Sequence, residues 1–240
     1  EEKRIKEVIQ QHKGEIAGEF KLGVIPTVAS SLLPRFLKAF LKDYPKVKLQ
    51  IEELQTKTIL DKLKNGMLDA GIMATPLGQD GIIEKSLYYE PFMAYVPKDH
   101  RLFPEKFIDN TDLQENDLLL LNEGHCFRNS VINLCKNFFD KNSEKSVKLE
   151  SGSFETLIRL SNQGFGMTLV PYLTSLEIKS EENKDCVKPF SRPQPMREIS
   201  LVHHRTHLKI SIINALAKCV QETIPSHMLE NKDGDVIKPY

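Results

Sequence analysis

The chain has 240 residues, in which 33 basic side chains balance 33 acidic ones to a formal net charge of zero. Proteins that bind nucleic acid non-specifically usually carry a basic excess, so this balance argues against such binding by the chain itself. No apolar run approaches the roughly 18 residues of a membrane span. Four cysteines are too few for a disulfide scaffold, and the length predicts one large domain or two smaller lobes.

The sequence begins with Glu1 rather than methionine, which predicts a fragment or a processed chain. Residues 1–13 have the pattern of a charged helix with apolar Ile5, Val8 and Ile9, and Gly14 and Gly18 are typical of a linker. The low cysteine content favours a reducing cytosol, where any disulfide would be transient.

The first half of the chain alternates predicted strands and helices. Residues 19–25 have the alternating apolar pattern of a strand. A helix is expected to begin near Ser30 or Ser31, to tolerate Pro34 in its first turn and to end at Tyr44. The next expected elements are a strand over 47–54, a helix over 56–65 and a strand over 68–74. This alternation indicates βαβ units and a mostly parallel sheet.

A second series of the same kind follows. Its expected elements are strands over 92–96 and 118–121, a helix over 129–139, a strand over 147–150, a helix capped by Ser153, strands over 167–170 and 199–203, and a helix over 211–223. After Pro225 the chain is polar and is expected to fray. The predicted fold class is therefore α/β, with two lobes.

The residues most suited to chemistry follow the apolar run 118–121. Gly124 turns the chain there and places Cys126 at or near the first turn of the next helix, where open α/β sheets bind ligands. The positive end of the helix dipole, Arg128 and a protonated His125 would each lower the pKa of the Cys126 thiol. A thiolate at this position would react with an oxidant to give a sulfenic acid.

The distance to the next cysteine decides what a second thiol can do. Cys135 lies nine residues after Cys126, which in a continuous helix is about 13.5 Å along the axis and the opposite face. A disulfide needs its Cα atoms within about 7 Å. The two thiols can bond only if the helix unwinds, so oxidation would become a conformational switch. The alternative is two unrelated thiols, with Cys135 buried as a small apolar residue.

The segment Gly124-His125-Cys126-Phe127-Arg128, with its second cysteine at Cys135, resembles the redox switch of the OxyR family, the hydrogen-peroxide sensors among the LysR-type transcriptional regulators. The resemblance covers roughly residues 18–223, and the cysteine arrangement is its most specific part. The other matching runs, shared by LysR effector domains generally, are Gly23-Val24-Ile25-Pro26-Thr27-Val28, Leu54-Gln55-Thr56, Gly66-Met67-Leu68-Asp69, Phe154-Glu155-Thr156-Leu157 and Gly164-Phe165-Gly166-Met167-Thr168-Leu169-Val170-Pro171.

The resemblance implies two Rossmann-like lobes of the periplasmic-binding-protein type. Lobe I would comprise residues 18–91 and 206–228, and lobe II, which carries the redox cysteines, residues 92–205. Residues 1–17 would be the remnant of the linker helix that leads to a DNA-binding domain, and residues 229–240 would form a carboxyl-terminal tail.

The resemblance also implies roles for six residues. Cys126 would be the peroxidatic thiolate and Cys135 the resolving thiol. The residues expected to line a peroxide pocket are Thr27, Thr56, His125 and Arg128, whose hydroxyls and cation can orient peroxide and stabilise its leaving oxygen. Each has a plainer alternative: helix capping for the threonines, a structural role for His125 and a solvated first-turn position for Arg128.

We expect no metal and no cofactor. His203, His204 and His207 have spacing that suits a metal, but no carboxylate or thiol accompanies them in the sequence. Cys186 and Cys219 are expected to be bystanders.

The partners implied by the resemblance are hydrogen peroxide as effector, further copies of the chain in a homodimer or homotetramer, DNA through an N-terminal winged helix-turn-helix that this chain lacks, RNA polymerase, and a thioredoxin- or glutaredoxin-type reductant. The protein would be a cytoplasmic regulator and not an enzyme. Two alternatives stay open: a thiol peroxidase that uses the same cysteines, and a non-redox domain or solute receptor that binds a small anion between its lobes.

Overall fold

The computed structural model describes residues 16–114, 117–135, 150–178, 183–231 and 234–240. The chain divides into two compact units. Unit 1 extends up to Tyr88 and includes Glu198–Glu230, whereas unit 2 comprises Tyr89–Arg197 and Asn231–Tyr240. The predicted lobe boundaries were 91/92 and 205/206. The structure divides earlier in both places, within two long strands that run through both units, β4 (Ile82–Tyr95) and β9 (Gln194–His204).

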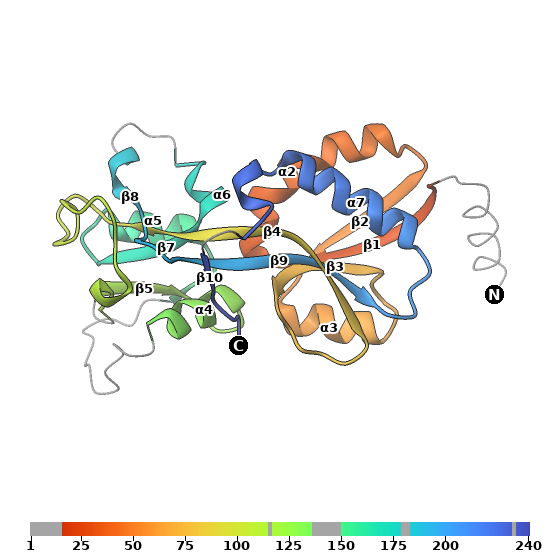
Figure 1. Cartoon of the computed structure of the whole chain (residues 1–240), viewed down its shortest axis with the longest axis horizontal. Helices are drawn as coiled ribbons and strands as arrows, with labels where there is room; N and C mark the ends of the chain where they lie inside the picture. The colour runs from red at the N-terminus through yellow and green to blue at the C-terminus, as the bar shows by residue number, and fades with distance from the viewer. Residues whose placement is uncertain (1–15, 115–116, 136–149, 179–182, 232–233) are drawn as a thin grey trace. The chain divides into compact units, whose positions relative to one another are not determined.

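Unit 1 is a sheet with helices on both faces. Strand β1 pairs in parallel with β2 and with β3, and β9 runs antiparallel to β3. Helices α2 and α7 pack together on one face and α3 covers the other (Figure 1). The bounds are β1 Gly18–Val24, α2 Pro26–Asp43, β2 Val47–Glu53, α3 Thr56–Lys64, β3 Ala70–Thr75, α7 Ile210–Thr223 and the short 3₁₀ turn η4 Ser226–Met228.

Helix α2 corrects the prediction that the first helix starts near Ser30 or Ser31. It begins at Pro26, and the main-chain N–H groups of Val28 and Ala29 bond to the carbonyl oxygen of Ile25. A proline at the first helical position loses nothing, because that N–H would have no intrahelical partner. Pro34 consequently lies inside the helix and not in its first turn.

Unit 2 contains a mixed sheet. Strand β5 pairs in parallel with β6 and β7, and β4 runs antiparallel to β7 and β8. The bounds are η1 Asn110–Asp112, β5 Leu118–Leu121, α4 Cys126–Leu134, β6 Glu150–Ser151, α5 Phe154–Ser161, β7 Met167–Pro171, α6 Tyr172–Ser175, η3 Lys184–Cys186, β8 Val187–Pro189 and β10 Gly234–Val236.

Several predicted elements of unit 2 need correction. The helix expected over 129–139 begins three residues earlier, at Cys126, and ends at Leu134; residues 136–139 lie outside the described residues. The strand expected over 147–150 falls there as well, except for the first residue of β6. The strand expected over 92–96 is only the end of β4, because residues 82–91 group apolar and polar side chains in pairs and Pro91 interrupts them, so they lack the alternating pattern of a strand.

The tail after Pro225 does not fray as predicted. Asn231 closes a turn with Gly234 through bonds of 2.9 and 3.2 Å. Strand β10 then pairs in parallel with Gln194–Met196 of β9. The partner residues lie 40 positions earlier in the sequence, so local polarity gave no sign of this pairing. None of the helices in the described part of the chain is both long and apolar enough to cross a bilayer.

Candidate functional site

Both candidate redox cysteines lie on helix α4, one at each end. Cys126 is the first helical residue, as predicted, and Cys135 is the residue that caps the other end. Both are buried, with 6% and 1% of their surface exposed, and both are free thiols. Nine residues of continuous helix separate them by about 13.5 Å along the axis, whereas a disulfide needs Cα atoms within about 7 Å. The two sulfurs can meet only if α4 opens.

The apolar face of α4 is part of the core of unit 2. Phe127, Val131 and Leu134 are each at most 9% exposed and belong to one buried cluster. The Phe127 ring stacks on Phe92 at 5.0 Å between centroids and meets the edge of Phe154 at 5.1 Å. Each such side chain contributes roughly 1.5–3 kcal/mol when buried. The closed helix is therefore the favoured state while both cysteines remain thiols.

The amino-terminal end of α4 is fixed to the neighbouring strand. His125 precedes the helix with extended backbone geometry, and its side chain is buried. The guanidinium of Arg128 donates from Nη1 to the carbonyl oxygen of Leu121, the last residue of β5, at 3.2 Å. A cation in the first turn opposes the helix dipole, and this bond supplies a structural reason for its presence.

The two candidate threonines lie in unit 1, just after the carboxyl ends of strands β1 and β2. The ends of β1 and β2 are in register, Val24 opposite Glu53, and each threonine follows its strand by three residues. Thr27 and Thr56 are 4% and 6% exposed. Neither caps a helix, because α2 and α3 are capped by Ile25 and Gln55. Within the described residues, Thr56 Oγ1 is buried and has no hydrogen-bond partner.

The predicted pocket thus consists of two groups. Unit 1 places Thr27 and Thr56 together, and unit 2 places His125, Cys126 and Arg128 on the first turn of α4. A peroxide pocket that combines the two groups is a proposal.

A buried ion pair beside α4 was missed by sequence reasoning. Arg197 donates to Glu90 at 2.7 and 3.0 Å, and both side chains are at most 2% exposed. Glu90 also accepts from the N–H of Leu173, and the Arg197 guanidinium lies 5.1 Å from the centroid of the Phe127 ring. The cation therefore packs against the residue that follows Cys126. The sequence offers only one hint of this ion pair, an arginine within a largely apolar strand, and that hint does not reveal a partner 107 residues away.

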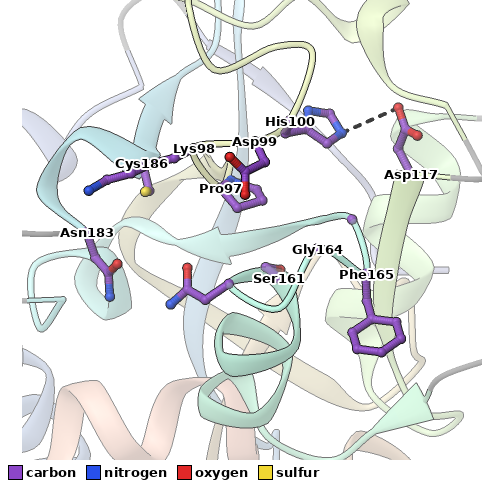
Figure 2. A pocket seen from close by; sticks show the side chains of 12 residues that line it. Pro97, Lys98, Asp99, His100, Asp117, Ser161, Gly164, Phe165, Asn183 and Cys186 are labelled. Carbon is purple, nitrogen blue, oxygen red and sulfur yellow. Dashed lines mark ion pairs between the residues drawn. The ribbon is translucent and has the colours of Figure 1, made fainter.

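Unit 2 also has a cavity of about 530 Å³ that none of the predicted site residues lines (Figure 2). His100 points toward Asp117 in it, with Nε2 3.5 Å from Oδ2. The hydroxyl of Tyr95 bonds to Asn162 at 2.7 Å, and burial raises the pKa of Tyr95 to about 12. Burial likewise raises the pKa of the Cys186 thiol in the wall. A thiol that keeps its proton is a weak competitor for peroxide.

Burial also shifts the pKa values of other described cysteines and of His207. Burial raises the pKa of Cys135 to about 12 and also raises the pKa of Cys219. His207 approaches Asp69 at 3.6 Å, and desolvation lowers the pKa of its ring. Across the described ranges, no three histidine, cysteine or acidic side chains are grouped so that they could hold a metal ion.

Comparison with known proteins identifies the family of the chain. Residues 13–225 match the LysR substrate binding domain. The "Hydrogen peroxide-inducible genes activator" of Dickeya chrysanthemi is 31% identical over 230 residues, which are 95% of this chain and 73% of that protein. The chain spans about two thirds to three quarters of the length of such curated relatives.

Solved structures give the same result. The crystal structure of OxyR from Porphyromonas gingivalis has a TM-score of 0.84 and 31% identity, over 92% of this chain and all of that one. A hydrogen-peroxide-bound cysteine-to-serine mutant of OxyR from Corynebacterium glutamicum has a TM-score of 0.80 and 27% identity, over 92% of this chain and 70% of that one. The predicted periplasmic-binding-protein type of fold is confirmed. The chain belongs to the LysR substrate-binding domain family, within the group of OxyR-type regulators.

Proposed function

We propose that this chain is the redox-sensing regulatory domain of a LysR-type transcription factor that responds to hydrogen peroxide. The observation that carries the proposal is a pair of buried free thiols, Cys126 and Cys135, at opposite ends of one helix that packs into the core. The similarity to peroxide-inducible activators supports it.

The chemistry has two balanced steps. The Cys126 thiolate attacks one oxygen of hydrogen peroxide, the O–O bond breaks, and the second oxygen leaves as hydroxide and is protonated to water. The sulfur is then a sulfenic acid. The Cys135 sulfur attacks it, the S–O bond breaks, a second water leaves, and a disulfide forms. Thr27, Thr56, His125 and Arg128 would line the peroxide pocket, where hydroxyl and cationic donors stabilise the leaving oxygen.

The second step is what converts oxidation into a conformational signal. The bond forms only if α4 opens, and opening withdraws Phe127, Val131 and Leu134 from their places in the core. The segment must then repack to bury these side chains again. A repacked lobe is the two-state element that a redox switch requires.

The regulator would act through partners beyond this chain. DNA would be bound by an N-terminal winged helix-turn-helix in the full-length protein, which would assemble as a homodimer or homotetramer in the cytoplasm and engage RNA polymerase. A thioredoxin- or glutaredoxin-type dithiol would reduce the disulfide again. As a sensor and not an enzyme, the domain would react about once per reduction cycle. Steady peroxide consumption with an added reductant would instead identify a thiol peroxidase.

Mass spectrometry of the chain before and after one equivalent of peroxide tests the proposal. We expect a peptide pair linked through Cys126 and Cys135 after treatment and its loss with a dithiol reductant. If peroxide leaves both cysteines as thiols, the redox proposal is wrong, and a domain that binds a small anionic metabolite becomes the better account.

A further inference from the structure

The segment 234–240 holds the end of α4 next to Cys135. The side-chain amide of Asn133 donates from Nδ2 to the main-chain oxygens of Lys238 and Tyr240, at 3.0 and 3.1 Å. Asn133 lies in the last turn of the helix, two residues before Cys135. The residues that follow β10 reach α4, and the carboxyl-terminal end of the chain lies near this helix (Figure 1). Both hydrogens of one amide are therefore used to attach the helix end to this segment.

The other end of the segment is fixed to a different element. Gly234–Val236 pair with Gln194–Met196 of β9, and the N–H of Ile237 donates to the carbonyl oxygen of Met196 at 2.8 Å. The Ile237 side chain packs against the apolar core of unit 2, and Pro239 is buried. The segment thus runs from a strand that contains neither cysteine to the helix that must open.

The proposed disulfide conflicts with this attachment. Cys135 has to approach Cys126 by roughly 6 Å or more, since the helix holds them about 13.5 Å apart and the bond allows about 7 Å. Asn133 moves with Cys135, because only one residue separates them. The two Asn133 bonds must then break, since β9 and the core retain the other end of the segment.

We propose that Asn133 is a positioning residue that, through segment 234–240, slows closure of the Cys126–Cys135 disulfide without affecting the first reaction with peroxide. This inference rests on the proposed function. The attachment of Asn133 to segment 234–240 would lengthen the lifetime of the Cys126 sulfenic acid, so that a dithiol could reduce it before helix α4 opens. The peroxide concentration needed to form the disulfide would then depend on this attachment as well as on the reactivity of the Cys126 thiolate.

The test separates the two steps in the full chain. Rapid mixing with peroxide, followed by dimedone trapping, gives the rate of sulfenic acid formation, and quenched-flow mass spectrometry gives the rate of disulfide closure. We expect Asn133→Ala to close about tenfold faster, given the modest net value of such hydrogen bonds. Sulfenic acid formation should stay within twofold of native. Asn129→Ala, which removes an exposed asparagine of the same helix, is the matched control and should close at the native rate.

A second variant weakens the other end of segment 234–240, where it is attached to β9. Ile237→Pro removes the N–H that bonds to Met196 and should also speed closure about tenfold. The double variant should be no faster than either single one, because each change breaks the same connection from β9 to α4, at opposite ends of segment 234–240. Additive effects, or closure of Asn133→Ala at the native rate or slower, would overturn the inference. If the native chain forms no Cys126–Cys135 bond at all, the proposed function itself fails.

Discussion

The two ends of α4 are held in different ways. The amino-terminal end is attached by Arg128 to the last residue of β5, inside the same sheet. The carboxyl-terminal end is attached by Asn133 to a segment 105 residues away in sequence. If Cys126 reacts with peroxide and Cys135 resolves the product, as proposed, the first attachment can persist during the first step, whereas the second would break in the second step. One helix would then combine a fixed reactive thiol with a releasable resolving thiol.

Replacing either cysteine should have the largest effect and should separate their roles. Cys126→Ser is expected to abolish both sulfenic acid and disulfide, because no other described thiol lies at a helix start. Cys135→Ser should still form the sulfenic acid on Cys126 but no disulfide. Dimedone labelling and intact mass after peroxide measure both, with Cys186→Ala as a control that retains the bridge. A disulfide that Cys135 forms with another cysteine in Cys126→Ser would show that Cys126 is not required for oxidation.

The core contacts of α4 set how hard the helix is to open. Phe127→Ala removes a ring that packs on Phe92, Phe154 and Arg197 and should lower the free energy of unfolding by about 3–5 kcal/mol. Urea denaturation measures the loss. Phe165→Ala, which truncates a half-exposed ring of the same unit, is the control and should change stability by less than about 0.5 kcal/mol. Equal losses would mean that α4 is not anchored in the core.

Alkaline pH should favour the open helix through Cys135. Burial raises the pKa of this thiol from 9.0 to about 12, so the closed helix retains a proton that the opened segment releases. Between pH 9 and about pH 12, the free energy of opening the helix therefore falls as the pH rises. Labelling of Cys135 by iodoacetamide should therefore keep rising about tenfold per pH unit above pH 9. The same thiol in urea-unfolded chain should level off near pH 9, and identical profiles for the two samples would contradict its burial.

The smallest expected effect is at the fixed end. Arg128→Lys keeps the charge but loses the guanidinium geometry of the bond to Leu121. We expect sulfenic acid formation to slow roughly threefold to tenfold, because the first turn that presents Cys126 loosens, while disulfide closure keeps its native rate. Rapid-mixing kinetics distinguish this pattern from that of Asn133→Ala. Faster closure with unchanged sulfenic acid formation would erase the distinction between the two ends.

Local patterns in the sequence predicted most of the elements. The alternation of strands and helices placed the cores of β1, β2, β3, β5 and β7 correctly, and the turn at Gly124 placed Cys126 on the first turn of α4. The start of α2 was missed because proline can open a helix as well as interrupt its pattern. The first part of β4 was missed because its apolar and polar residues come in pairs and do not alternate as in a typical strand.

The contacts that could not be predicted join residues far apart in the chain. Glu90 and Arg197 look like ordinary surface charges until two strands bury them together. Asn133 looks like an ordinary polar position on a helix, and its bonds to segment 234–240 depend on the pairing of β10 with β9. Spacing reveals which residues share a helix, whereas only the folded chain shows what restrains that helix.

Hydrogen exchange of the α4 amides shows directly whether this helix opens on oxidation. In the reduced chain, the N–H groups of Arg128 and Cys135, which bond to His125, Val131 and Ile132, should exchange slowly. After one equivalent of peroxide we expect loss of this protection together with a Cys126–Cys135 bridge, and recovery of the protection with a dithiol. Protection of α4 that survives formation of the bridge would mean that the disulfide forms without opening of the helix.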